Sequence, residues 1–100
     1  MKQIDAVIPK LMLQEVQNAL IEIGVNDFME SAIMCHGHQK GQIMIYRGAR
    51  FVANVVEKVK LEIIAADDSV DKITKAISSI VKTGNSEDYR ISLRPYLEVA

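Results

Sequence analysis

The residues best suited to chemistry are gathered in one short run, Met34-Cys35-His36-Gly37-His38, which holds both histidines and the only cysteine. Side chains two apart share a face of a strand, so an extended backbone would align Met34, His36 and His38 and place Cys35 opposite. Thioether and imidazole groups are ligands for Cu(I), and imidazole also suits Zn²⁺. The run predicts a metal site on His36 and His38. The alternative is two solvated histidines at the rim of a strand.

The same run opens a longer stretch, residues 37–55, whose composition favours binding of a partner protein. Three glycines, Gly37, Gly41 and Gly48, interrupt it, so we expect a long functional loop that is neither a regular strand nor a helix. Exposed apolar side chains are costly unless a partner covers them at times, which favours docking over a merely solvated basic surface. The residues expected to bind the partner are Lys40, Ile43, Met44, Ile45, Tyr46, Arg47, Arg50 and Phe51.

Several classes of function are disfavoured by the sequence. No serine or cysteine nucleophile lies beside a base, and no paired carboxylates occur in a pocket-forming context, so we expect no enzyme. A net charge of −1 over 100 residues argues against a nucleic-acid binder. No apolar run reaches the ~18 residues of a membrane span, and Asp5 and Pro9 break the N-terminal run, so neither membrane insertion nor a signal peptide is expected. A single cysteine favours the reducing cytoplasm.

The rest of the chain predicts regular elements that hold this loop. Alternating apolar and polar residues indicate strands, and apolar residues at helical spacing indicate helices that Gly24 and Gly84 end. Asp67, Asp68 and Ser69 are expected to cap the second helix. The expected strands cover residues 2–8, about 28–36, 58–63 and about 89–97, and the expected helices carry the apolar stripes Leu13-Val16-Leu20-Ile23 and Val70-Ile73-Ile77-Ile80.

The resulting order, strand-helix-strand-loop-strand-helix-strand, predicts one α+β domain over residues 1–100. It is the pattern of the ferredoxin-like sandwich, in which a four-stranded antiparallel sheet carries both helices on one face. The other face would hold a mixture of polar and apolar residues, namely Val7, Lys60, Glu62, Ile64 and Ser92. A half-apolar face in so small a domain favours burial against other subunits over simple solvation.

Several motifs resemble the PII signal-transduction family of nitrogen regulation. They are the opening MKQIDAVI, then GHQKG, IYRGARF, VEKVKLEII, DDSVDKI and KTG, and together they cover about residues 1–94. The resemblance implies a cytoplasmic homotrimer of ferredoxin-like subunits. Its long loop, the T-loop (here about residues 37–55), would dock onto a metabolic enzyme or a membrane transporter. Adenine nucleotides, often with 2-oxoglutarate, would bind in the clefts between subunits and set the shape of the T-loop.

The resemblance also assigns effector binding to individual positions. Lys58 matches the lysine that pairs with the 2-oxoglutarate carboxylate, Glu62 and Ile64 match residues that line the adenosine pocket, and Arg90 replaces a phosphate-binding lysine. The first three residues of the T-loop stand where the family holds phosphates or the magnesium-bound effector. The full set is Gly37, His38, Gln39, Lys58, Glu62, Ile64, Asp88 and Arg90.

Other positions depart from the family pattern, mostly around one phosphate site. The family reads T-G-x-x-G-D-G-K after the second helix, and this chain reads TGNSEDYR, so Glu87 and Tyr89 replace two glycines. Glu87 would repel a phosphate, and Tyr89 would obstruct its approach to the backbone. His38 replaces a phosphate-contacting arginine, Met29 replaces a small hydroxyl residue, and the family's C-terminal arginine pair has no counterpart before Ala100. These changes favour ADP, AMP or no nucleotide over ATP, and they leave 2-oxoglutarate an open question.

The sequence thus predicts a divergent PII-like regulatory trimer. The tyrosine that the family uridylylates is Phe51 here, and Ala49 replaces a serine that some members phosphorylate, so these two covalent switches are not expected. Two alternatives stay open. One is a metal-binding or metal-efflux-associated trimer, similar to CutA, that uses His36 and His38. The other is an interaction module whose nucleotide site has decayed.

Overall fold

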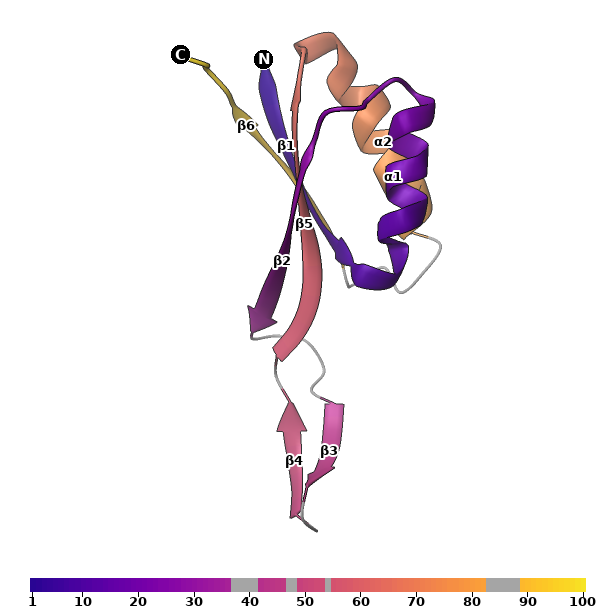
Figure 1. Ribbon diagram of the computed structural model, residues 1–100, viewed down its shortest axis with the longest axis vertical. Helices are drawn as coiled ribbons and strands as arrows, with labels where there is room; N and C mark the ends of the chain where they lie inside the picture. Colours follow the sequence, from indigo (N-terminus) through magenta and orange to yellow (C-terminus); the bar gives the residue numbers. More distant parts are fainter. Residues whose placement is uncertain (37–41, 47–48, 54, 83–88) are drawn as a thin grey trace.

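The computed structural model describes residues 1–36, 42–46, 49–53, 55–82 and 89–100, of which residues 42–55 are described by their backbone alone. Two short 3-10 turns, Lys10–Met12 and Asp67–Ser69, lead into the two helices (Figure 1). The strands and helices, in chain order, are β1 Lys2–Pro9, α1 Leu13–Glu22, β2 Met29–His36, β3 Gln42–Tyr46, β4 Ala49–Ala53, β5 Val55–Ala65, α2 Val70–Val81 and β6 Arg90–Pro95.

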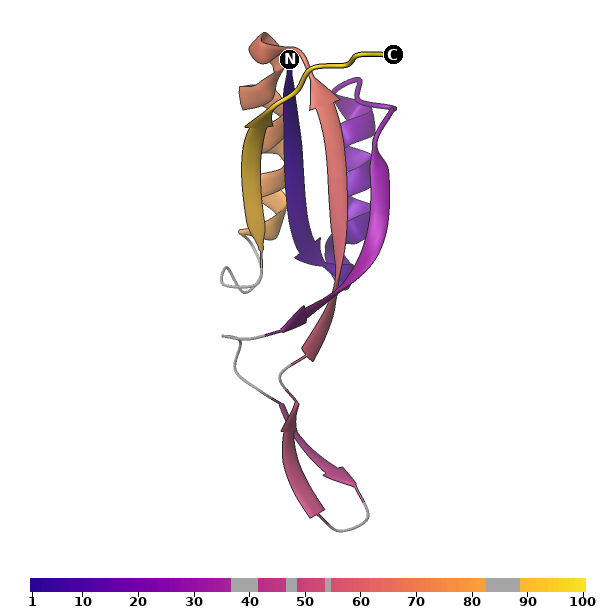
Figure 2. The same cartoon turned by 90° about the vertical axis from the view of Figure 1, so that its left-hand side faces the viewer.

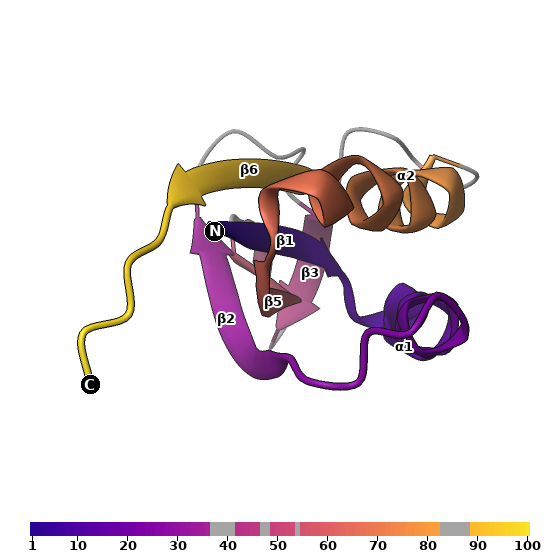
Figure 3. The same ribbon diagram turned by 90° about the horizontal axis from the view of Figure 1, so that it is seen from above.

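The main sheet has four strands in the order β2-β5-β1-β6, and every neighbouring pair is antiparallel. Ile4 of β1 lies between Ile63 of β5 and Leu93 of β6 in this register. Seen from above, both helices lie on the same side of the sheet (Figure 3). This arrangement confirms the predicted ferredoxin-like fold.

The core lies between the sheet and the two helices. Alternate residues of β1, Ile4, Ala6 and Ile8, are fully buried there, as their spacing predicted. The helices add Val16 and Leu20 from α1, and α2 contributes its own apolar stripe. The complete set of buried residues is Ile4, Ala6, Ile8, Val16, Leu20, Val59, Leu61, Ile63, Ala65, Val70, Ile73, Ile77 and Val81.

The opposite face of the sheet, here called the open face, is not covered by helices. Three of its residues are nevertheless nearly inaccessible: Asp5 is 4% exposed, Lys58 6% and Val7 8%. Neighbouring side chains on the same face shield them, because all three lie on the two central strands, β1 and β5. The register assigns the described part of the open face to Gln3, Asp5, Val7, Met29, Ser31, Ile33, Cys35, Val56, Lys58, Lys60, Glu62, Ile64, Arg90, Ser92 and Arg94.

The T-loop contains regular structure, and the expectation of an irregular loop was wrong. Strands β3 and β4 pair as an antiparallel hairpin that runs from the pair Gln42–Ala53 to the pair Tyr46–Ala49. Figure 2 shows this hairpin beyond the end of the main sheet, along the longest dimension of the molecule, 53 Å. Both segments are rich in β-branched and aromatic residues, QIMIY and ARFVA, and this local preference outweighed the glycines around them.

Smaller differences concern the ends of elements. The last strand stops at Pro95 rather than continuing to Leu97, whose side chain is 85% exposed, because proline has no N–H to give to a ladder. In α2 the core residue is Val81, and Ile80 is only partly buried. Gly24 ends α1 with a positive φ of 91°, as predicted, whereas Gly84 lies outside the described residues. Across the chain that the structure describes, no helix has the length and hydropathy to span a membrane.

Candidate functional site

Of the residues expected to bind an effector, those that the structure describes share the open face. Lys58, Glu62 and Ile64 come from alternate positions of β5, and Arg90 opens β6. Arg90 pairs with Val7 of β1, which pairs in turn with Lys60 of β5, so Arg90 and the β5 residues point to the same side. They do not converge within one chain, because β6 and β5 are two strand spacings, about 10 Å, apart. The set therefore lines a surface and does not enclose a pocket.

Lys58 is the most unusual member of this set. The residue as a whole is 6% exposed and has an aliphatic neighbour on each side in the register, Pro9 on β1 and Ile33 on β2. Among the residues that the structure describes, no carboxylate or other polar group forms an ion pair or a hydrogen bond with its side chain. Its Nζ atom is not one of the described buried atoms that lack a partner, so the ammonium group keeps contact with water while the aliphatic stem is covered. The position is therefore suited to an anion.

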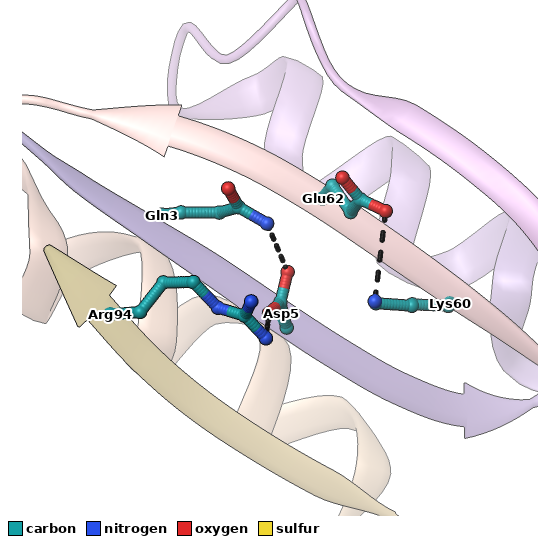
Figure 4. Close-up of polar contacts among 5 residues, drawn as sticks. All are labelled: Gln3, Asp5, Lys60, Glu62 and Arg94. Carbon is teal, nitrogen blue, oxygen red and sulfur yellow. Dashed lines mark hydrogen bonds and ion pairs between the residues drawn. The ribbon is translucent and has the colours of Figure 1, made fainter. Parts of the chain in front are cut away.

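A second polar group on the same face consists of Gln3, Asp5 and Arg94 (Figure 4). The Gln3 side chain donates a hydrogen bond of 2.8 Å from Nε2 to Oδ1 of Asp5, and Nη2 of Arg94 lies 2.7 Å from Oδ2 of Asp5. The contact with Arg94 is close enough for an ion pair, although its angles do not make it a hydrogen bond, so Oδ2 is satisfied by charge alone. Sequence reasoning missed this group; the only signal was an aspartate inside an apolar run.

Beside that group, Lys60 and Glu62 form a looser ion pair along β5, with Nζ 3.7 Å from Oε1. Both side chains are about one-third exposed. Glu62, expected to line an adenosine pocket, is thus already in contact with a cation of its own strand.

The proposed metal ligands are only partly described. His36 ends β2 with an exposed side chain and shares its face with the exposed Met34, while Cys35 lies on the open face, as the alternation predicted. His38 lies outside the described residues. Within the described ranges no three histidine, cysteine or acidic side chains are grouped so that they could hold a metal ion. Metal binding at His36 and His38 stays a prediction.

The residues expected to bind a partner fall largely on the hairpin. Ile43, Met44, Ile45 and Tyr46 belong to β3, and Arg50 and Phe51 belong to β4. In the register, Met44 pairs with Phe51 and Ile45 with Arg50. The remaining predicted residues, Gly37, Gln39, Lys40, Arg47 and Asp88, lie outside the described part of the chain.

A cavity of about 290 Å³ lies at the other end of the molecule from the hairpin, where the chain between α1 and β2 meets the end of β5 and the start of α2. Its lining includes the apolar Ile63 and Ile73 and the polar Asp27, Ser69 and Lys72. Of the expected effector residues that the structure describes, Ile64 alone lines this cavity. No sequence pattern predicted this cavity.

Comparisons of this chain with a family model and with known proteins agree on one family. The family model described as Nitrogen regulatory protein P-II matches residues 1–91. The nitrogen regulatory protein P-II of Azospirillum brasilense is 36% identical over 99 residues, which cover 99% of this chain and 88% of that protein. Nitrogen regulatory protein P-II of Klebsiella oxytoca and nitrogen regulatory protein P-II 1 of Escherichia coli K12 are each 37% identical over 91 residues, covering 91% of this chain and 81% of theirs. The chain belongs to the nitrogen regulatory protein P-II family.

Proposed function

We propose that this protein is a homotrimeric regulator of the cytoplasm, not an enzyme, that senses a small anionic effector and binds a target protein through its T-loop. The effector is an adenine nucleotide, ADP or AMP in preference to ATP, alone or with a small anion such as 2-oxoglutarate. The target is a metabolic enzyme or a membrane transporter. Family membership supports the regulatory role, and the open face supports the site.

The observation that carries the proposal is the state of Lys58. The residue is nearly buried, its ammonium group keeps contact with water, and it has no ion-pair partner among the described residues, so an anion can reach it and pair with it. A carboxylate or phosphate bound there would gain a charge-assisted contact in a site of low dielectric constant. The lysine lies in the part of β5 that leads down to the hairpin, so a ligand at this position would lie close to the base of the T-loop.

The dispersed positions of the effector residues support binding between subunits. Lys58 and Glu62 lie on β5 and Arg90 lies on β6, with β1 between the two strands, which leaves a ligand at any one of them exposed in a single chain. A second copy placed against this face would supply the missing walls. This arrangement agrees with the half-apolar character of the face, which includes the exposed Met29 and the partly buried Ile33 and Ile64.

The hairpin can couple binding of the effector to binding of the target protein. It extends beyond the sheet, and its strands β3 and β4 carry most of the residues expected to bind a partner. An effector that binds better to one arrangement of the T-loop than to another shifts the population toward that arrangement. The affinity for the target then changes by the corresponding coupling free energy.

Isothermal titration calorimetry of the full chain with ATP, ADP and AMP, each with and without 2-oxoglutarate or bicarbonate, tests the proposal. Lys58→Gln removes the unpaired cation. Lys75→Gln is the matched control, because Lys75 is an exposed lysine of α2 on the other side of the sheet. We expect saturable heat for the wild type and for Lys75→Gln, with affinity reduced at least about tenfold in Lys58→Gln, the loss of one charge-assisted contact.

The possible outcomes test the sensor role, the part played by Lys58 and the trimer separately. Absence of heat with every nucleotide would exclude the sensor role and leave an interaction module. Equal binding by Lys58→Gln and the wild type would show that the buried lysine is not part of the site. Light scattering on the same samples tests the trimer independently of any ligand.

A further inference from the structure

The cavity at the end of the molecule opposite the hairpin has the features of a small-molecule site. Three segments border it: residues 23–27 between α1 and β2, the last residues of β5, and the start of α2 (Figure 1). Its volume, about 290 Å³, is close to the lower limit of about 300 Å³ for pockets that bind small molecules. Lys58, Glu62 and Arg90 do not line it. A ligand in this cavity would therefore occupy a site separate from that of the proposed effector.

The apolar part of the lining is anchored in the core. Ile63 of β5 and Ile73 of α2 are 1% and 2% exposed, and the partly buried Ile23 and Val25 pack against the same core. Their packing holds these side chains in place, so the cavity offers a preformed surface of branched aliphatic groups. A ligand with a short apolar part would bury apolar area there without a rearrangement of the chain.

The polar part of the lining has no partner within the chain. Asp27 and Lys72 form no ion pair with each other or with any other residue that the structure describes. Their side chains also make no hydrogen bond to those residues. A serine at a helix N-cap commonly bonds a backbone N–H of the first turn, but Ser69 forms no such bond at the start of α2. All three side chains are therefore free to contact a ligand.

The charges of the lining indicate which class of ligand fits. A simple anion would be attracted by Lys72 and repelled by Asp27, and a simple cation would experience the reverse. The two charges therefore offset each other for any ligand of a single sign. A zwitterion gains from both, because its ammonium group can pair with Asp27 while its carboxylate pairs with Lys72.

We propose that this cavity binds a free α-amino acid with an aliphatic side chain, such as valine or leucine. The ammonium group pairs with Asp27, the carboxylate contacts Lys72 and Ser69, and the aliphatic side chain lies against Ile63 and Ile73. The inference goes beyond the proposed nucleotide sensor and does not depend on it. An amino acid bound there links the end of α1, β5 and α2 and so stabilises the folded chain.

Calorimetric titration of the full chain with L-leucine and L-valine tests this inference, and the methyl resonances of Ile63 and Ile73 in NMR spectra detect binding too weak to give heat. We expect saturable binding of at least one of the two amino acids. Isoamylamine and 4-methylpentanoate, which are leucine without its carboxylate and without its amine, should each bind at least about fivefold more weakly than leucine. Glycine keeps both charges but lacks the side chain, and it should bind at least about tenfold more weakly.

Variants of the two charged residues locate the site. Asp27→Asn and Lys72→Gln should each lower the affinity for the amino acid at least about fivefold. Asp71→Asn and Lys75→Gln are the matched controls, because both residues are exposed on α2 and do not line the cavity; they should bind like the wild type. Circular dichroism checks that every variant is folded.

Two results would overturn the inference. One is the absence of both heat and methyl shifts with leucine and valine at millimolar concentrations. The other is unchanged affinity in Asp27→Asn and Lys72→Gln, or binding of 4-methylpentanoate as tight as that of leucine, which would exclude recognition of a zwitterion. Lys58→Gln should bind the amino acid like the wild type, so a failure at this cavity is distinguished from a failure of the nucleotide site.

Discussion

The two faces of the main sheet are built by the same four strands and obey different rules. On the helix-covered face, Ile4, Leu61 and Ile63 are buried by α1 and α2, and their apolar character explains their position completely. On the open face, Asp5 and Lys58 are almost as inaccessible, although no helix covers them. Burial on the first face stabilises the chain through apolar contacts, whereas the second face places charged residues among the shielded ones. Asp5 is compensated within the chain by Arg94 and Gln3, and Lys58 has no ion-pair partner among the described residues.

Truncating a side chain of the helix-covered core is the strongest test of this difference between the two faces. Ile77→Ala removes a fully buried side chain of α2 and should lower the free energy of unfolding by about 2–5 kcal/mol. Ile64→Ala, on the open face and only partly buried, should cost clearly less. Urea denaturation at one fixed protein concentration measures both, because assembly makes stability depend on concentration. Equal losses would mean that the two faces are equally packed.

Removing the charge at position 58 of the open face should change stability much less than truncating the core. Lys58→Met keeps most of the side-chain volume and removes an ammonium group that has no ion pair with the described residues, so we expect the free energy of unfolding to change by at most about 1 kcal/mol. The same variant should lose its calorimetric response to the effector. A larger loss of stability in Lys58→Met would show that the lysine is stabilised by a partner outside the described residues.

Gly24, which follows α1 on the helix-covered side of the sheet, has a backbone conformation that few other residues tolerate. Gly24 has a φ of 91°, and a Cβ at this position would meet no atom within 4 Å, so any cost of substitution is backbone strain and not collision. Gly24→Ala should destabilise the chain by about 1 kcal/mol. Gly24→Asn should cost about half as much, since asparagine tolerates positive φ better. Thermal unfolding monitored by circular dichroism distinguishes the two.

The smallest effect is expected for the exposed ion pair of the open face. Lys60→Gln and Glu62→Gln each remove a contact of 3.7 Å between side chains that are about one-third exposed, and we expect changes in stability below about 0.5 kcal/mol for the isolated chain. The same substitutions measured in the assembled protein should have larger effects if this pair is covered by another copy. Denaturation at low and at high protein concentration makes the comparison.

The sequence predicted the elements better than it predicted their polar contacts. Alternation along β1 and β5 and the apolar stripe of α2 are local patterns, and the structure confirms them at Ile4, Leu61 and Ile77. The β3–β4 hairpin was missed because glycines were given more weight than the β-branched residues between them. The expected cap of α2 was also wrong: its first residues make no side-chain capping bond, and Asp67 instead lies 3.2 Å from the N-terminal amine of Met1.

The candidate site is formed by the pairing of strands that are distant in the sequence, and no local sequence pattern contains that information. Asp5 and Arg94 are 89 positions apart and meet because β1 and β6 pair in one particular register. The burial of Lys58 likewise follows from its place between Pro9 and Ile33 of two other strands. Family resemblance supplied the expected effector positions, but it gave no reason to expect that Lys58 would be almost fully shielded by its neighbours.

Pro95, at the end of β6, has a consequence for the colloidal behaviour of the protein. An edge strand with free N–H and C=O groups is a template for aggregation, and β6 is such an edge. Proline at its end and arginines at positions 90 and 94 make this edge short, charged and poor in donors. Sheet extension from copy to copy is thereby discouraged. Association is directed to the faces of the sheet, where a ring can close, and away from its edges, where a fibre would grow without limit.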